Sequence, residues 1–249
     1  MPLVQAVILA GGLATRLGAR TEHTPKILLP VAGRPFAAWL LEALVRSGYD
    51  EALLLVGHLG DAVRAALGDG GAFGLRLAYR DDGPVLLGTG GALRAAARGG
   101  ALGARFVVTY GDALLPFDYA SPLADLDAHP EALGTMAVYR NDNRFDRSNV
   151  RLDPGGAAGP LVAEYRELAR GAPADPGLHH IDYGAIALRR EALALLPPEP
   201  VVSFGALQAR LAREGRLRAL EVETRFFEIG SPAGLAALED ELRRRGGVA

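Results

Sequence analysis

The order of apolar segments in this 249-residue sequence predicts an α/β fold, with helices on both faces of a mainly parallel sheet. In the first half, β-rich segments lie at residues 4–9, 52–56, 75–79 and 105–110, with helical patterns between them at 35–47, 60–67 and 88–98. Strands that alternate with helices of this length favour right-handed βαβ units, in which the strands run parallel. The strand segments are also nearly unbroken apolar runs, which is typical of strands buried on both faces. Together these observations predict a Rossmann-like sheet.

The second half follows a less regular pattern and is expected to form a lobe with a mixed sheet. Its predicted strands are residues 135–140, 149–152, 161–166 and 181–188, and its predicted helices are 190–195, 204–214 and 232–245. Turns rich in glycine and proline separate these strands, for example at 153–156 and 172–177. We expect one domain over residues 1–249, made of a first half at 1–118 and a second half at 119–249 that closes over it.

Composition and charge exclude several classes of function. The formal net charge is −2, so the chain lacks the broad positive field with which proteins bind nucleic acids or anionic membranes. No run approaches the ~18 apolar residues that a membrane helix needs, and the N-terminal residues lack the cationic segment of a signal peptide. The absence of cysteine excludes disulfides, thiolate zinc sites and a cysteine nucleophile. A cytoplasmic protein is therefore expected.

The basic residues single out one position. Lysine and arginine number 27 in total, and Lys26 is the single lysine among them. An ammonium on a flexible chain is a compact point charge that can follow a phosphoryl oxygen as it moves, whereas a guanidinium is a planar fork. Because arginine fills the cationic role everywhere else, the sequence favours a phosphate-handling role for Lys26 over the alternative of a solvated loop residue.

Loops that contain glycine follow the first and the fourth predicted strands. Gly11 and Gly12 come after the first strand, and Gly111 and Asp112 come after the fourth. In open α/β sheets ligands bind at the carboxyl ends of the strands, so both loops are expected to face one crevice. Paired glycines let the backbone approach a ligand and leave N–H groups free for phosphate oxygens. The first loop matches neither the Walker sequence nor the dinucleotide GxGxxG sequence, which argues against a nicotinamide-dependent dehydrogenase.

Several strings of the sequence resemble the signature of the sugar-1-phosphate nucleotidylyltransferases. They are LAGGLATRL at 9–17, PKILLPVAGRP at 25–35, LGTGGAL at 87–93, GD at 111–112 and FEIGSP at 227–232. Their order and approximate spacing are similar to those of the family over nearly the whole chain. The distance from Arg16 to Lys26 differs from the molybdopterin guanylyltransferase type, in which the lysine follows sooner. The string at 87–93 and the short chain are most similar to the compact heptose- and mannose-1-phosphate guanylyltransferases.

The resemblance implies a reaction in which a nucleoside triphosphate and a sugar 1-phosphate give a nucleotide-sugar and pyrophosphate. It implies that Arg16 contacts the β- and γ-phosphates, and that Lys26 bridges the α-phosphate and the sugar phosphate. Asp112 is then expected to hold Mg²⁺. Glu228 stands where the family usually has a second aspartate, so it is expected to share the metal, directly or through water. Elementary electrostatics agrees, because an anion that attacks an anionic phosphorus needs charge neutralisation and in-line positioning.

The resemblance also assigns residues to the two substrates. The nucleotide-binding set consists of Leu9, Ala10, Gly11, Gly12, Thr15, Gly88 and Thr89. The sugar-binding set consists of Asn149, Glu167 and Asp182. All three members of the second set lie in the second half of the chain, which is therefore expected to be a sugar-binding lobe.

The sugar-binding set departs most from the family pattern. Asn149 replaces a glycine, and asparagine is the residue other than glycine that best tolerates a positive φ. Glu167 is followed by leucine, where the family has a lysine, and Arg166 or Arg170 is a candidate substitute. Asp182 replaces an asparagine. Because an ionised carboxylate only accepts hydrogen bonds, Asp182 indicates either a sugar rich in hydroxyl donors or a structural aspartate.

The sequence leaves the base, the sugar and the oligomeric state open. A uridylyl-, thymidylyl- or cytidylyltransferase is an alternative to the guanylyltransferase, as is transfer to phosphocholine, and a homo-oligomer is compatible with the chain. A hypothesis of a different class is a regulatory module that binds nucleotide-sugars without catalysis. The presence of Arg16, Lys26 and Asp112 argues against that module, because a sensor needs neither these cations nor a metal carboxylate.

Overall fold

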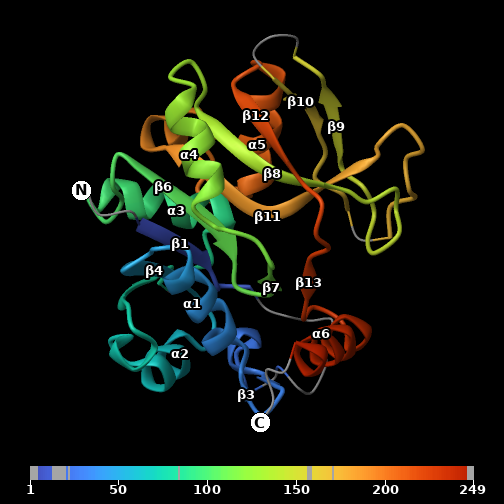
Figure 1. The fold of residues 1–249 in the computed structure, drawn as a ribbon. Coiled ribbons are helices and arrows are strands. Elements are labelled where there is room, and N and C mark those ends of the chain that lie inside the picture. The colour runs from blue at the N-terminus through green and yellow to red at the C-terminus, as the bar shows by residue number, and fades with distance from the viewer. Residues whose placement is uncertain are drawn as a thin grey trace. The chain divides into compact units, whose positions relative to one another are not determined.

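The computed structural model describes residues 5–12, 21, 23–83, 85–155, 159–169 and 171–245 (Figure 1). By its internal contacts the chain separates into two compact units. The first unit comprises Met1–Leu86, Thr109–Asp118 and Phe226–Ala249, and the second comprises Leu87–Val108 and Tyr119–Arg225. The last segment of the chain therefore belongs with the N-terminal residues, and each unit is assembled from separate stretches of sequence.

The first unit consists of short strands and helices in the order that the sequence predicts, with a few small additions. Its elements are β1 (Gln5–Leu9), η2 (Lys26–Leu28), β2 (Pro30–Val31), β3 (Arg34–Pro35), α1 (Phe36–Arg46), β4 (Glu51–Val56), α2 (Gly60–Leu67), η3 (Gly71–Phe73), β5 (Arg76–Asp81), β7 (Ala113–Leu114), β13 (Phe227–Glu228) and α6 (Pro232–Arg244). The strand β6 (Arg105–Tyr110) begins in the second unit and ends in the first.

Three strands of the first unit form the parallel arrangement that the sequence predicts. β4 lies between β1 and β5 and pairs with both in parallel, for example Ile8 with Leu54 and Leu54 with Tyr79. All of β1 and all but the first residue of β4 are buried, as expected for strands covered on both faces. The buried residues of α1 recur every three or four positions and form one apolar stripe. The prediction of parallel βαβ units is confirmed here.

The second unit contains the mixed sheet. Its elements are α3 (Gly88–Arg98), the start of β6, α4 (Ser121–Ala128), β8 (Gly134–Arg140), β9 (Val150–Asp153), β10 (Leu161–Tyr165), β11 (His180–Arg189), η5 (Arg190–Leu195), α5 (Phe204–Arg213) and β12 (Leu217–Val222). The strand order is β6-β11-β8-β12-β10-β9. β8 pairs with β12 in parallel, whereas β11–β8, β10–β12 and β10–β9 are antiparallel. Helix α4 packs on β8 and β11, and α5 packs on β10 and β12 (Figure 1).

Two elements of the second unit are absent from the sequence prediction, and one has a different helix type. Helix α4 is short and contains Pro122 and two aspartates, so its apolar pattern is weak. Strand β12 lies inside the sheet although its sequence, LRALEV, places Arg218 in a buried position. Residues 190–195 form a 3-10 helix. The local pattern did not indicate β12, because a buried charged residue in a central strand needs a partner of opposite charge. The sequence does not show that Arg218 has such a partner.

That partner is Asp125 on α4. Arg218 is 4% exposed, and its Nε and Nη2 atoms donate hydrogen bonds to Asp125 Oδ2 and Oδ1 at 2.8 and 3.2 Å. Thr135 on β8 donates a third hydrogen bond to Asp125 Oδ2 at 2.8 Å, and His129 Nδ1 lies 3.6 Å from Oδ1. Burial alone would raise the pKa of Asp125, but the hydrogen bonds and charges of these neighbours bring the pKa below its usual value. This network joins α4, β8 and β12.

The network predicts a loss of stability in acid. Because the pKa of Asp125 is lower in the folded state than in the unfolded state, its contribution is complete above the unfolded value and is lost as the pH falls through the folded value. Between pH 5 and pH 3, the free energy of unfolding in urea should fall more for the wild type than for Asp125→Asn, which keeps the shape but cannot ionise. Equal losses in the two proteins would show that Asp125 does not carry this pH dependence.

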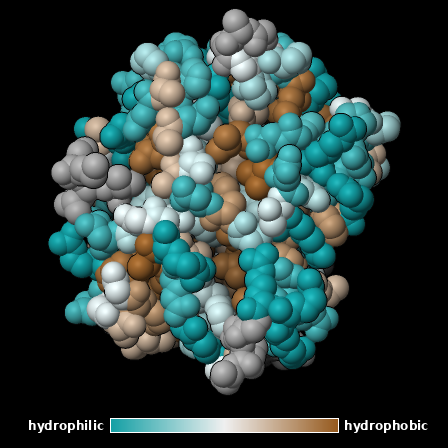
Figure 2. All heavy atoms as spheres, viewed as in Figure 1, coloured by the Kyte–Doolittle hydropathy of each residue, from teal (hydrophilic) through white to brown (hydrophobic). Residues whose placement is uncertain are grey.

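Within the described ranges, no helix combines the length and apolar character needed to cross a bilayer. On the face shown in Figure 2, hydrophilic residues cover most of the surface and hydrophobic residues form small separate patches. The described large hydrophobic residues that are exposed are Val85, Phe145 and Val201. Scattered exposed side chains of this kind are normal on globular proteins.

Candidate functional site

The first unit brings the single lysine into contact with the aspartate that follows β6. Lys26 Nζ donates a hydrogen bond to Asp112 Oδ2 at 2.7 Å, and the two residues form an ion pair. The Lys26 side chain is 15% exposed and the Asp112 side chain is 34% exposed, so a ligand can still reach the carboxylate. The residues are 86 positions apart in the sequence, and the fold makes them neighbours.

The contact depends on the way β6 ends beside β1. The Gly111 N–H donates a hydrogen bond to the Leu9 carbonyl oxygen at 2.9 Å. A Cβ atom at Gly111 would lie 2.9 Å from that oxygen and 3.3 Å from Ile27 Cδ1, so only glycine fits without displacement. Ile27 belongs to η2, whose first residue is Lys26. The close approach at Gly111 therefore sets Asp112 beside Lys26.

A methyl group at Gly111 should separate the pair. Gly111→Ala is expected to lower the free energy of unfolding by about 1–3 kcal/mol, because the new Cβ meets backbone that cannot move cheaply. A crystal structure of the variant should show a longer distance between Lys26 Nζ and Asp112 Oδ2. Gly103→Ala is the matched control, since its Cβ would meet only a carbonyl oxygen at 3.4 Å. Equal destabilisation by the two substitutions would contradict this account.

The predicted nucleotide-binding residues of the first unit lie at the end of β1. Leu9 is buried, and the Ala10 N–H donates to a carbonyl oxygen of β4 at 2.9 Å. A Cβ at Gly11 would lie 3.3 Å from the backbone nitrogen of Gly57, so the loops after β1 and β4 pack closely there. Gly12 is exposed, and a Cβ there would meet nothing within 4 Å. Open space over Gly12 is compatible with its predicted role.

Three of the residues named from the sequence cannot be placed in this site. Thr15 and Arg16 lie outside the described residues, as does Arg170. Their predicted contacts with the nucleotide phosphates and the sugar stay predictions from the sequence.

Glu228 has a structural partner that the sequence did not indicate. Its backbone pairs with Ala113 in the short β13–β7 ladder, next to Asp112. Its carboxylate accepts hydrogen bonds from the Gly230 N–H and, at 2.8 Å, from the Ser231 hydroxyl group. Ser231 is the N-cap of α6, so Glu228 braces the start of that helix. Both carboxylate oxygens thus already accept a hydrogen bond, and the role of Glu228 in binding Mg²⁺, directly or through water, stays a prediction from the sequence.

The glycine-rich string of the second unit is held by residues 202–204. The Gly90 and Gly91 N–H groups both donate to the Val202 carbonyl oxygen, at 2.9 and 3.1 Å. The Thr89 hydroxyl oxygen accepts a hydrogen bond from the N–H of Phe204, the first residue of α5, at 2.8 Å. Thr89 therefore holds the start of α5, and its predicted contact with the nucleotide stays a prediction from the sequence. Among the described residues, no backbone acceptor outside α3 contacts the N–H groups of Gly88 and Thr89.

Two of the predicted sugar-binding residues are joined directly. The Asp182 N–H donates to Asn149 Oδ1 at 2.9 Å, and Asp182 Oδ1 accepts from the Gly184 N–H at 2.9 Å. Asp182 Oδ2 accepts a hydrogen bond from Gln208 Nε2 on α5 at 2.7 Å. Asn149 does not have a positive φ. Its ability to adopt that conformation in place of glycine is therefore not used here.

Glu167 is connected to the start of the same helix. Its Oε2 atom accepts a hydrogen bond from the hydroxyl group of Ser203, the N-cap of α5. Arg166, the described candidate for the missing lysine, instead pairs with Glu164 and Asp175. Within the described ranges Glu167 forms no ion pair. No described cation therefore takes the place of the lysine that the family pattern supplies, and Arg170, the other candidate, lies outside the described residues.

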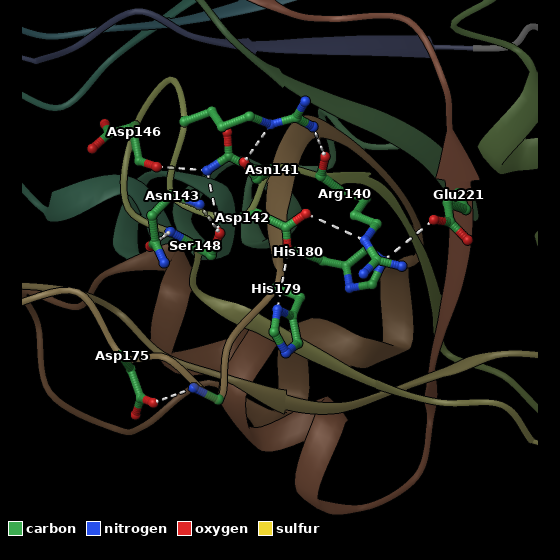
Figure 3. Close-up of polar contacts among 12 residues, drawn as sticks. Arg140, Asn141, Asp142, Asn143, Asp146, Ser148, Asp175, His179, His180 and Glu221 are labelled. Carbon is green, nitrogen blue, oxygen red and sulfur yellow. Dashed lines mark hydrogen bonds and ion pairs between the residues drawn. The ribbon is translucent and has the colours of Figure 1, made fainter.

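A loop with several internal hydrogen bonds precedes Asn149. Asn141 is fully buried, and its amide nitrogen donates hydrogen bonds to the Asp146 carbonyl and the Ser148 hydroxyl oxygen (Figure 3). His179 Nδ1 lies 3.0 Å from Asp142 Oδ1, and His180 Nε2 lies 3.3 Å from a carboxylate of β12 (Figure 3). The two histidines thus contact carboxylates at the beginning of β11, in the segment that leads to Asp182.

The described residues do not form a complete metal site by themselves. Among the described residues, no group of three or more His, Asp or Glu side chains is arranged to hold a metal ion. Magnesium is commonly held by one or two carboxylates together with substrate phosphates and waters. Asp112 meets this requirement, because Lys26 contacts one of its oxygens and the described residues offer the other no hydrogen bond.

Sequence reasoning missed Gln208, Ser203 and Gly57. A signal for Gln208 was present, because a glutamine stands on the apolar face of α5 between Leu207 and Leu211. A polar residue in an apolar stripe must find a polar partner, although the sequence does not tell which. Ser203 also carried a signal, since serine before a helix is a typical N-cap. Nothing local distinguishes Gly57 from other loop glycines.

Comparisons with known proteins extend these observations. A family model described as a MobA-like NTP transferase domain matches residues 6–223. The N-acetylmuramate alpha-1-phosphate uridylyltransferase of Neisseria meningitidis serogroup B is 36% identical over 161 residues, which cover 64% of this chain and 69% of that protein. The mannose-1-phosphate guanylyltransferase of Mycobacterium tuberculosis is 40% identical over 91 residues, which cover 36% of this chain but 25% of that protein.

Solved structures share the fold. The crystal structure of HddC from Yersinia pseudotuberculosis complexed with GMP-PN has a TM-score of 0.78 and 22% sequence identity, over 96% of this chain and 100% of that chain. The inositol-1-phosphate CTP transferase from T. maritima has a TM-score of 0.74 and 17% identity, over 99% and 98% of the two chains. At these identities the likeness concerns the fold alone, and it confirms the α/β fold expected from the sequence.

Proposed function

Because the chain belongs to the MobA-like NTP transferase family, we propose that it transfers a nucleotidyl group from a nucleoside triphosphate to a sugar 1-phosphate and releases pyrophosphate. We propose GTP as the donor and a mannose- or heptose-type sugar phosphate as the acceptor. The observation that carries the reaction is the contact of 2.7 Å between Lys26 Nζ and Asp112 Oδ2, which puts a cation and a potential metal ligand side by side at the ends of β1 and β6.

The proposed chemistry is electrostatic. An oxygen of the sugar phosphate attacks the α-phosphorus, the bond from that phosphorus to the oxygen bridging the α- and β-phosphates breaks, and pyrophosphate leaves with the bonding electrons. Two anions must approach each other, so the protein must neutralise charge and align the groups. Lys26 supplies a mobile positive charge for this purpose, and its contact with Asp112 keeps the ammonium at the strand ends before the substrates bind. Arg16 is proposed to bind the departing phosphates.

Asp112 is the proposed main protein ligand for Mg²⁺. Its carboxylate is partly exposed and carries one Lys26 contact, which suits a metal that also needs substrate oxygens and waters. A bound Mg²⁺ would supply positive charge against the phosphate oxygens. Glu228 is proposed to contribute through water, since its oxygens already accept hydrogen bonds from Gly230 and Ser231.

The choice of GTP rests on the string at 87–93 and on the similarity to the guanylyltransferase of Mycobacterium tuberculosis over 91 residues. A second candidate is UTP with N-acetylmuramate 1-phosphate. It is favoured by a different observation, the longer alignment of 161 residues with the Neisseria meningitidis uridylyltransferase. These two candidates share the reaction and differ in both substrates.

A substrate panel tests the proposal. GTP, UTP, dTTP and CTP would each be mixed with mannose, heptose, glucose and N-acetylmuramate 1-phosphates, and pyrophosphate release measured with and without Mg²⁺. We expect the highest kcat/KM for GTP with the mannose or heptose phosphate. Faster release from UTP with N-acetylmuramate 1-phosphate would establish the second candidate. If no pair releases pyrophosphate and the protein binds a nucleotide-sugar, the proposal of an enzyme is wrong and the hypothesis of a regulatory module takes its place.

A further inference from the structure

Three side chains of the second unit form what we call the acceptor cluster, namely Glu167, Asp182 and Gln208. Gln208 on α5 contacts Asp182 on β11, and Glu167 contacts the Ser203 cap of the same helix. Glu167 and Asp182 are already proposed to face the sugar. Gln208 has no assigned role, and its environment indicates one.

Gln208 is buried with an unsatisfied carbonyl group. The residue is 1% exposed, and its Oε1 atom has no hydrogen-bond partner among the described residues. The orientation of the amide is fixed, because an ionised Asp182 only accepts hydrogen bonds and must therefore face the nitrogen end of Gln208. An unpaired buried acceptor costs free energy, and a folded protein keeps one most readily where a ligand or water completes it.

Asp182 is held from three directions. Gln208 Nε2 donates to Oδ2 at 2.7 Å, the Gly184 N–H donates to Oδ1 at 2.9 Å, and the Asp182 N–H is bound by Asn149 Oδ1 at 2.9 Å. The carboxylate therefore has little freedom to rotate. Of these three contacts, the one from Gln208 is the one that a side chain donates to the carboxylate, so it helps to set the direction in which the Asp182 carboxylate faces.

The cluster also has a negative electrostatic character. Glu167 makes no ion pair within the described ranges, and nearby Arg166 is engaged by Glu164 and Asp175. The negative charges of the cluster also act on Tyr165 on β10. Burial raises the pKa of the Tyr165 hydroxyl group, and the charges of Asp182 and Glu167 raise this pKa further. A second anion placed near the cluster would meet the same repulsion.

We propose that Gln208 is a positioning residue for acceptor specificity, which holds the Asp182 carboxylate so that the acceptor cluster binds the hydroxyl groups of a neutral sugar and rejects sugar phosphates with a second anionic group. The cluster offers acceptors, and sugar hydroxyl groups are the donors that match them. This inference rests on the proposed function, and it selects neutral hexose- or heptose-type acceptors over acidic sugars such as N-acetylmuramate, whose lactyl group carries a carboxylate.

The first test compares two acceptors that differ by one charge. A hexose 1-phosphate and its uronic acid counterpart, with a carboxylate in place of the terminal hydroxymethyl group, would be assayed with the nucleotide that the panel identifies. We expect kcat/KM to be at least about tenfold higher for the neutral sugar, because a like charge would be placed near the cluster. Equal use of the two acceptors would overturn the inference.

The second test removes the amide. Gln208→Met preserves the length of the side chain and deletes both of its hydrogen-bonding ends. We expect KM for the neutral sugar phosphate to rise about tenfold while KM for the nucleotide stays within about twofold, because the lost interaction concerns the acceptor. Gln5→Met is the matched control, since Gln5 is also buried and also donates to a carboxylate, that of Glu51, on the first unit. The control should leave KM for the sugar unchanged.

The outcomes separate the two proposals. If no nucleotide and sugar pair releases pyrophosphate, the proposed function fails and the inference fails with it. If pyrophosphate is released and Gln208→Met behaves like Gln5→Met, the inference alone is wrong. If Gln208→Met does not fold, Asp182→Asn tests the inference instead. Because this substitution removes one negative charge from the cluster, the ratio of kcat/KM for the neutral sugar to that for its uronic acid counterpart should fall. An unchanged preference would overturn the inference.

Discussion

Lys26→Ala is expected to lower kcat/KM for nucleotidyl transfer by roughly 2–4 kcal/mol of transition-state stabilisation, about 30- to 1000-fold, the loss typical of one preorganised charge contact. Lys26 contributes the single lysine charge of the chain, and its ammonium already lies against Asp112 at the ends of β1 and β6. Folding should persist, because the Asp112 carboxylate is 34% exposed and water can solvate it when its partner is removed. Steady-state pyrophosphate release measures kcat/KM, and urea unfolding checks that the variant is folded.

Lys26→Arg is the informative control. It keeps the charge but replaces a compact ammonium with a planar fork that cannot follow a moving oxygen in the same way. We expect Lys26→Arg to recover only part of the activity that Lys26→Ala loses. Activity near the wild-type level in Lys26→Ala would remove Lys26 from the mechanism, and full activity in Lys26→Arg would show that charge alone is required.

Asp112→Asn should abolish the response to Mg²⁺ together with most of the activity. The substitution keeps the shape and removes the negative charge, so the metal loses its main protein ligand and Lys26 loses its ion-pair partner. A loss of about 3 kcal/mol of transition-state stabilisation or more is expected, comparable with removal of one oxyanion contact. The measurement is pyrophosphate release as a function of Mg²⁺ concentration.

Glu228→Gln separates the two carboxylates. Glu228 already accepts hydrogen bonds from Gly230 and Ser231, so we expect a smaller increase in the Mg²⁺ concentration needed for half-maximal activity than Asp112→Asn would cause. An Asp112→Asn enzyme that is still activated normally by Mg²⁺ would assign the metal to another ligand. A larger effect at Glu228 than at Asp112 would reverse their proposed roles.

The family and the parallel sheet were predicted from the sequence because both depend on local pattern. Apolar runs such as 52–56 mark a strand buried on both faces, and the helical pattern at 60–67 coincides with α2. The motif strings that suggested the sugar-1-phosphate nucleotidylyltransferases fall largely inside the range of the matched family model, and that resemblance is confirmed. Elements such as β12 could not be predicted, because a buried arginine in a central strand is stable only with a partner of opposite charge. For Arg218 that partner is Asp125, on a different element.

For the candidate site, the sequence predicted residues but not their contacts. It placed Lys26 and Asp112 at strand ends, and the fold brings them to 2.7 Å. It also named Thr89 as a nucleotide contact, and the fold shows in addition that its hydroxyl oxygen accepts a hydrogen bond from the N–H of Phe204 at the start of α5. A motif records which residue types occur in order, whereas hydrogen-bond partners from distant segments depend on packing that the motif does not contain.

The sequence by itself determined the α/β class, the chain order of most elements and the loops that follow the first and fourth predicted strands, because periodicity and turn composition act over a few residues. Only the tertiary structure decided that Gly111 must be glycine and that Gln208 holds Asp182. Each of these depends on the distance between atoms from different elements. Such distances are set when the apolar faces of those elements pack, and no local stretch of sequence encodes them.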